Sequence, residues 1–263
     1  MKRKIIDFHA HAFPEEIAQK AVNHIGNHYT IKMQGKGILP DLIQSADNAG
    51  IDYIVIHSTA TRACQVKHIN DWVASHTSEK MIGFGTLHPD MPDVEEEFER
   101  IVSLGLKGIK LHPDFQGFNA DDLSMDRIYS VIDNRLPLLI HCGDEKLDSS
   151  SPKRIANVLD KFPRLTIIAA HLGGHKNWQE SMEYLVCRDI YMDTSSAIRF
   201  MDSAFATKLI KKHGINRIVF GTDYPITYHE NELEFFYKLD LSESEREDIL
   251  YNNAARILGL PMD

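Results

Sequence analysis

Histidine and aspartate recur in this chain at the ends of short apolar runs. One such residue closes each of eight runs, and together they are His9, His57, His88, His112, His141, His171, Asp193 and Asp223. Buried apolar strands have no structural reason to end in imidazole so often. Imidazole and carboxylate are side chains that hold Zn²⁺, Mn²⁺ or Fe²⁺, and a bound divalent ion lowers the pKa of water and polarises carbonyl groups. The pattern therefore predicts a metal centre that activates water.

His9 and His11 are the first candidate metal ligands. They stand at positions i and i+2 of an expected strand, so both imidazoles point to the same side and can hold one cation. Asp223 ends the last run, and a closed barrel would place it beside the first strand. We expect Asp223 to bind the metal and also, as the catalytic base, to take a proton from water. The alternative role for such an aspartate is to cap the N-terminus of a helix.

His141 and His171 each follow an apolar run directly, and a glycine stands two residues after each of them. Glycine allows a sharp turn and the close approach of a ligand. We expect His141 to be a metal ligand. For His171 the sequence leaves two roles open, a metal ligand or a catalytic residue at the substrate. The alternative for either is a buried histidine bonded to a carbonyl group.

Four further residues are candidates for substrate binding. Lys110 and His112 are two residues apart and share one face of an expected strand. Lys110 has three alternative roles: a carboxylated bridge between two metal ions, an ammonium that holds a substrate anion, or a structural partner of a carboxylate. Arg62 and Arg199 follow the second and seventh runs and are candidates to clamp a substrate carboxylate, with a plain surface position as the alternative for each.

The eight apolar runs alternate with helix-sized segments. The runs span residues 5–11, 53–58, 81–88, 106–112, 136–141, 165–171, 190–194 and 217–223. Most are continuous apolar stretches, which is typical of parallel strands buried on both faces. Eight βα units predict an α/β fold, a closed (β/α)₈ TIM barrel with the metal site at the C-terminal ends of its strands.

We expect a single domain over residues 1–263, because no linker, low-complexity segment or charge block divides the chain. The long segment 13–50 is expected to hold an extra helix or a loop that covers the barrel mouth. His24 and His28 lie four residues apart on an expected helix in this segment, and we expect both to face solvent.

Composition excludes several functional classes. The chain has 263 residues, 43% of them hydrophobic, and a formal net charge of −9. An acidic chain without a basic run is a poor partner for nucleic acid or an anionic membrane, and no run approaches the ~18 apolar residues of a membrane span. Three dispersed cysteines, Cys64, Cys142 and Cys187, make no disulfide framework. We therefore expect a cytoplasmic protein that acts on a small molecule, with a homodimer as the default assembly.

As a set, these motifs resemble those of the amidohydrolase superfamily. The resemblance is carried by residues 9–11, 108–113, His141, 171–174, 221–225 and 253–259, and so covers nearly the whole chain. The most similar branch is the amidohydrolase-related group that includes aminocarboxymuconate-semialdehyde decarboxylase, hydratases and lactonases. The resemblance implies that His9, His11, His141 and Asp223 bind one divalent metal ion, usually zinc, and that His171 acts at the substrate. It does not fix the reaction, because one fold hosts many chemistries.

We expect a metal-dependent hydrolase, with Zn²⁺ as the first candidate and Mn²⁺ or Fe²⁺ as alternatives. Its substrate would be a small, carboxylated lactone, ester or amide, attacked by a water whose proton passes to Asp223. The alternative reaction is that of a lyase, a decarboxylase or hydratase that acts on an unsaturated carboxylic acid. A third class, a non-catalytic binding protein, would require an incomplete ligand set, and here every expected position is filled.

Overall fold

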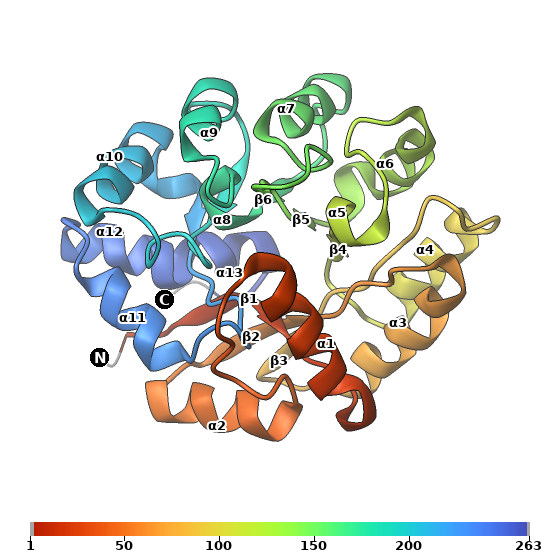
Figure 1. Ribbon diagram of the computed structural model, residues 1–263, viewed down its shortest axis with the longest axis horizontal. Coiled ribbons are helices and arrows are strands. Elements are labelled where there is room, and N and C mark those ends of the chain that lie inside the picture. The colour runs from red at the N-terminus through yellow and green to blue at the C-terminus, as the bar shows by residue number, and fades with distance from the viewer. Residues whose placement is uncertain (1–2, 262–263) are drawn as a thin grey trace.

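The computed structural model describes residues 3–261, and within them it shows eight parallel strands surrounded by helices (Figure 1). The strands are β1 (Ile6–His11), β2 (Tyr53–His57), β3 (Met81–Gly83), β4 (Ile109–Leu111), β5 (Leu138–Ile140), β6 (Ile167–Ala169), β7 (Tyr191–Asp193) and β8 (Ile218–Val219). Each strand lies inside a predicted run, and most are shorter than the run, because the polar residues after them leave the hydrogen-bonded ladder.

Two seams close the strands into a barrel. Ladders of hydrogen bonds join β1 to β3 and, separately, β4 to β8, in chain order. A parallel bridge pairs Gly85, after β3, with Ile109 of β4, and another pairs Ala10 of β1 with Tyr224, after β8. At the second seam the His11 amide also donates to the Tyr224 carbonyl at 2.7 Å. The predicted (β/α)₈ TIM barrel is therefore confirmed, and the C-terminal ends of its strands meet on one face.

The helices follow the strands as βα units require. They are α1 (Glu15–Tyr29), α2 (Leu39–Ala49), α3 (Val66–Ser75), α4 (Val94–Ser103), α5 (Pro113–Gln116), α6 (Asp126–Ile132), α7 (Pro152–Lys161), α8 (Ala170–Gly173), α9 (Trp178–Tyr184), α10 (Ser203–His213), α11 (His229–Tyr237), α12 (Glu243–Glu247) and α13 (Asn253–Leu258). Local chemistry sets their starts: at α12 the Ser242 hydroxyl accepts from the Glu245 amide, while the Glu245 carboxylate accepts from the Ser242 amide. Within residues 3–261, no helix is both long and apolar enough to cross a membrane.

The barrel interior is apolar at one end and polar at the other. A cluster that includes Phe8, Leu139 and Val219 fills the apolar end. Lys110 pairs in register with Leu139, and Asp193 pairs in register with Val219. Because residues in register on neighbouring parallel strands point to the same face, Lys110 and Asp193 also point into the barrel. The strands therefore carry charged groups inward, onto an apolar base.

Residues 13–50 hold α1 and α2, which confirms the predicted extra helix, and α1 lies in front of the strands in Figure 1. Its C-terminal end is tied to the loop after β5, because His28 Nε2 lies 2.7 Å from Asp144 Oδ2 and Lys146 Nζ donates to the His28 carbonyl. The expectation that His28 faces solvent is wrong, since its ring pairs with a buried carboxylate. His24 is exposed, as expected.

Candidate metal centre

A cavity of about 870 Å³ opens at the C-terminal ends of the strands. Its floor consists of residues that end or follow strands, namely His11, His112, His141, His171, His175 and Asp223. Its wall consists of the cavity-lining residues of α1 and of segment 58–72, which follows β2, and includes Ile25, Tyr29, Arg62 and Trp72. The cavity thus joins a floor of imidazoles and one carboxylate to a largely apolar wall.

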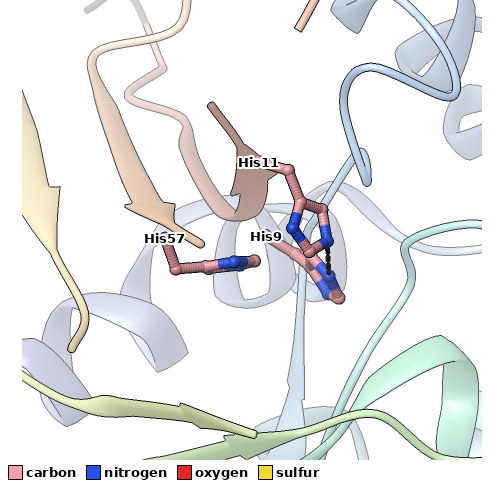
Figure 2. A group of neighbouring side chains, drawn as sticks. All are labelled: His9, His11 and His57. Atoms are coloured by element: carbon pink, nitrogen blue, oxygen red, sulfur yellow. Dashed lines mark hydrogen bonds between the residues drawn. The ribbon is translucent and has the colours of Figure 1, made fainter. Parts of the chain in front are cut away.

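The paired histidines of β1 meet the carboxylate of Asp223. His9 Nε2 lies 3.2 Å from His11 Nε2, and the same Asp223 oxygen lies 3.5 Å from His9 Nε2 and 3.2 Å from His11 Nε2. Figure 2 shows these two rings together with that of His57, which ends β2. The Asp223 amide donates to the His9 carbonyl at 2.8 Å, which fastens the loop after β8 to β1. Closure of the barrel therefore brings the carboxylate to the histidine pair, as expected.

Three imidazoles direct one ring nitrogen outward, to an oxygen that can only accept a hydrogen bond. The pairs are His9 Nδ1 with Asp193 Oδ2, His171 Nδ1 with the Ser195 carbonyl and His141 Nε2 with the Gly143 carbonyl, each at 2.8 Å. The ring proton therefore lies on the outward nitrogen, and the inward nitrogen carries a lone pair. His141 Nδ1 and His171 Nε2 face each other inward, 3.0 Å apart.

The floor histidines are neutral and the carboxylate is ionised. Burial lowers the pKa of His11 to about 4 and that of His171 to about 3, and it holds the pKa of His141 well below the usual value. Burial alone would raise the pKa of Asp223, but its interactions with the His9, His11 and His171 imidazoles, including the hydrogen bond with His11, hold it well below its usual range. Neutral imidazole and ionised carboxylate are the forms that bind a metal ion.

These donors fit a divalent cation. Lone pairs that face each other at 3.0 Å, as in the His141–His171 pair, repel unless a cation or proton lies between them. His57 is fully buried, and neither of its ring nitrogens has a hydrogen-bond partner among the described residues, although its ring centroid is 4.4 Å from that of His11. Buried polar atoms are normally satisfied, and a cation at this place would satisfy the lone pair of the His57 ring.

The predicted ligands do not all lie together. Ligand atoms of His9, His171 and Asp223 lie within 4.8 Å of one another, and those of His9, His11 and His57 form a second such group. His141 instead groups with His112 and Asp114, and it faces the first group across His171. The structure thus brings His9, His11 and Asp223 into direct contact and places His141 one contact away.

Lys110 and His112 occupy different levels of the site. Lys110 is fully buried beneath the floor, with Nζ 3.1 Å from His9 Nε2, and burial lowers its pKa to about 8. Lys110 is not among the described residues that line the cavity. His112 does line the floor, and its ring stacks on that of His141 with centroids 3.9 Å apart.

The two predicted arginines also differ. Arg62 lines the cavity wall. Arg199 is not among the described lining residues; its guanidinium lies 5.2 Å from the centroid of the Phe200 ring, and its charge lowers the raised pKa of the buried Glu232 carboxyl. Of the two arginines, only Arg62 lines the cavity.

Two cavity residues were missed by sequence reasoning. The Tyr29 hydroxyl, on α1, lies 3.3 Å from His112 Nε2 and 3.2 Å from His141 Nε2, and no strand pattern could have placed it there. His175 is buried, and its Nε2 has no hydrogen-bond partner in the described part of the chain. Gly143 is the sequence feature that could have pointed to His175. A Cβ at position 143 would lie 2.4 Å from the His175 amide nitrogen, so glycine at this position lets the loops after β5 and β6 touch.

Comparison with known proteins decides the family. The sequence model described as "Amidohydrolase" matches residues 6–260. The chain belongs to the amidohydrolase family. The match begins at β1 and runs beyond α13, so it contains every residue of the floor and wall. This amidohydrolase is thus an enzyme of a superfamily built on the TIM barrel, and its His and Asp groups are able to hold a metal ion.

Solved structures with this fold include two decarboxylases and a hydrolase. The 5-carboxyvanillate decarboxylase of Novosphingobium aromaticivorans, complexed with manganese and 4-hydroxy-3-methoxy-5-nitrobenzoic acid, is 18% identical with a TM-score of 0.73, over 98% of this chain and 97% of that one. The 2,6-dihydroxybenzoate decarboxylase from Rhizobium is 18% identical with a TM-score of 0.72, over 98% and 99%. A probable 2-pyrone-4,6-dicarboxylic acid hydrolase from Acinetobacter baumannii is 16% identical with a TM-score of 0.68, over 98% and 100%. At these identities the likeness shows the fold.

Proposed function

We propose that this amidohydrolase is a metal-dependent hydrolase that cleaves a lactone, ester or amide bond of a small carboxylated substrate. The observation that carries the proposal is the carboxylate of Asp223, which lines the cavity beside the inward nitrogens of His9 and His11. Hydrolysis needs a base next to the attacking water, and an ionised carboxylate at this place can accept the proton of that water.

His9, His11, His141 and Asp223 would hold the ion in this proposal. A divalent ion, when bound, supplies a water of lowered pKa and polarises the carbonyl group under attack. Zn²⁺ is the first candidate because three imidazoles and one carboxylate suit it. Mn²⁺ is the second, since the decarboxylase of Novosphingobium aromaticivorans holds it, and Fe²⁺ is the third.

In this proposal Asp223 transfers the proton and His171 orients the water or the substrate. Asp223 accepts a proton from the attacking water and returns it to the leaving oxygen or nitrogen, so one water is consumed and an acid and an alcohol or amine are released. His171 donates its Nδ1 proton to the Ser195 carbonyl, so its neutral Nε2 acts as an acceptor that orients a water or a substrate hydroxyl. The backbone of His171 is held at the end of β6, which fixes the position of this nitrogen in the site.

The cavity wall indicates the kind of substrate. A volume of about 870 Å³ suits a small organic molecule, and apolar side chains such as Ile25, Ile69 and Trp72 suit an apolar body. Arg62 would pair with a carboxylate on that body. The substrate is thus proposed to carry its reactive carbonyl at the floor and its carboxylate toward Arg62.

Decarboxylation is a second candidate, favoured by the apolar wall. Loss of CO₂ from a ring carboxylate is helped when the carboxylate leaves water for apolar surroundings. Two of the structurally similar enzymes are decarboxylases of aromatic acids. In this reaction a carboxylate and a proton become CO₂ and a C–H bond, and no water is consumed.

One assay separates the two reactions. The protein, loaded with Zn²⁺ or Mn²⁺, is tested against carboxylated lactones, esters and amides and against unsaturated and aromatic carboxylic acids, with the hydrolysis products and CO₂ measured separately. We expect hydrolysis products without CO₂ from the wild type, and almost no product from Asp223→Asn. CO₂ release without hydrolysis would overturn the hydrolase proposal in favour of the lyase.

A further inference from the structure

We propose that Asp193 is a positioning residue of the metal centre, whose carboxylate fixes the ring of His9 so that its inward nitrogen is available to a cation, and fixes the backbone of His171 so that its ring stays beside that site. Asp193 ends β7 and is fully buried. The inference rests on the proposed metal-dependent function and extends it to a residue outside the predicted ligand set.

Both oxygens of Asp193 are occupied. Oδ2 lies 2.8 Å from His9 Nδ1. Oδ1 accepts the backbone amides of His171 and Ser195, each at 3.0 Å, and the Ser195 hydroxyl at 2.5 Å. One carboxylate therefore joins the end of β1, the end of β6 and the segment after β7.

The contact with His9 fixes its tautomer. A carboxylate only accepts hydrogen bonds, so Nδ1 carries a ring proton and Nε2 is the nitrogen that can offer a lone pair. Nε2 is the atom that lies 3.2 Å from His11 Nε2 and 3.5 Å from the Asp223 carboxylate. Without Asp193 the ring could carry its proton on Nε2, the nitrogen that a metal ion requires bare.

The contact with His171 fixes an unfavourable backbone. His171 and the next residue, Leu172, have φ angles of +62° and +52°, in the left-handed region that is unfavourable for a non-glycine residue. The His171 amide donates to Asp193 Oδ1, and the His171 ring donates to the Ser195 carbonyl at 2.8 Å. Segment 193–195 thus holds both the backbone and the ring of His171.

Asp193 acts through these histidines and not as a ligand. Its Oδ2 lies at the Nδ1 edge of the His9 ring, whereas the predicted metal ligands lie at the Nε2 edge. The imidazole ring therefore stands between Asp193 and a cation bound at Nε2. Carboxylates that hold a metal-binding imidazole in this way typically contribute about 10–100-fold to metal affinity.

The test uses metal ions alone as the probe. Metal-free protein is titrated with Zn²⁺, and separately Mn²⁺, in competition with a chromophoric chelator. We expect Asp193→Asn to bind each ion about 10–100-fold more weakly than the wild type. The asparagine side chain has one acceptor oxygen and one donor nitrogen. That nitrogen would therefore face another donor, either His9 Nδ1 or the backbone amides of His171 and Ser195.

Asp121→Asn is the matched control. Asp121 pairs with Arg154 at 2.6 Å and is not among the described residues of the floor or wall, so the same chemical change there should leave metal affinity unchanged. Ser195→Ala is the milder variant, because it removes only the hydroxyl that donates to Asp193. We expect it to weaken binding by about tenfold, the lower end of the range.

Two further readouts separate positioning from a merely structural role. Melting temperature without metal reports the fold, and the visible absorption of the Co²⁺-substituted protein reports the geometry around the ion. We expect Asp193→Asn to change the Co²⁺ spectrum even when its melting temperature shows that the variant is folded. Wild-type affinity and an unchanged Co²⁺ spectrum in folded Asp193→Asn would overturn the inference. If that variant does not fold, wild-type affinity in Ser195→Ala would overturn it instead.

The same titration distinguishes this inference from the proposed function. If the wild type itself binds neither Zn²⁺ nor Mn²⁺, the metal-dependent function fails and the inference falls with it. If the wild type binds metal and both variants bind equally well, only the role of Asp193 fails.

Discussion

The floor and the wall of the cavity are held in different ways. Floor residues end or follow barrel strands, and their outward nitrogens contact groups such as the Gly143 and Ser195 carbonyls. The wall is carried by α1 and segment 58–72, outside the strand framework, and α1 is tied down through the His28–Asp144 contact. The floor therefore has its geometry set by the barrel, whereas the wall depends on how α1 and one loop sit over it.

This difference assigns different tasks to the two regions. Chemistry needs atoms held closely, and rigid strand ends provide that. Selection of a substrate needs surface and charge, which a helix and a loop can supply and vary. Substitutions in the floor should abolish turnover or metal binding, whereas substitutions in the wall should change KM more than kcat.

The largest effect is expected from Asp223→Asn. Loss of the proposed base should lower kcat by about 10²–10⁴-fold, while His9, His11 and His141 retain much of the metal. Turnover and metal content of the same preparation measure the two effects. Normal turnover in this variant would remove Asp223 as the base.

His171→Ala and His141→Ala form the second pair. We expect His171→Ala to keep its metal and to lose about 10²-fold in kcat, because His171 acts at the substrate. His141→Ala should lose metal. Equal loss of metal from both variants would move His171 into the ligand set. The distance of 3.0 Å between His171 Nε2 and His141 Nδ1 would then reflect two ligands of one ion.

Arg62→Gln and Arg199→Gln compare two arginines that the sequence treats alike. For a carboxylated substrate, Arg62→Gln should raise KM about 10–100-fold, since a charge-assisted hydrogen bond is lost, and should leave kcat nearly unchanged. Arg199→Gln should leave KM unchanged, because Arg199 is not among the described residues that line the cavity. A raised KM in Arg199→Gln and an unchanged KM in Arg62→Gln would show that Arg199, and not Arg62, binds the substrate carboxylate.

Tyr29→Phe should have the smallest effect. The hydroxyl contacts His112 and His141, so its loss removes hydrogen bonds worth about 1 kcal/mol each. We expect KM to rise about tenfold or less and the metal content to stay the same. Metal loss from this variant would mean that α1 stabilises the floor directly.

The strand ends were predictable because strand parity and barrel closure obey strict geometry. His9 and His11 are two residues apart on one strand and so share a face, and Asp223 reaches them because β8 neighbours β1 in a closed barrel. The position of His141 relative to His171 was not predictable, because it depends on ring orientations that the Gly143 and Ser195 carbonyls select. Sequence spacing carries no information on such contacts.

The wall was less predictable than the floor. An extra helix or a loop over the mouth followed from the length of segment 13–50, but the direction of Tyr29 and the pairing of His28 with Asp144 follow from tertiary contacts between distant segments. The same holds for Arg199, which stands after a strand as Arg62 does but is not among the described residues that line the cavity. Position in a βα unit predicts nearness to the mouth, not which neighbour a long side chain contacts.

Metal content tests the central claim most directly. The protein is purified without chelator, and its metals are measured by mass spectrometry beside the His9→Ala/His11→Ala double variant. We predict about one equivalent of zinc, manganese or iron per chain in the wild type and almost none in the variant. About two equivalents would implicate Lys110 as a bridge between two ions. No metal in the wild type, even after reconstitution with each ion, would contradict the account.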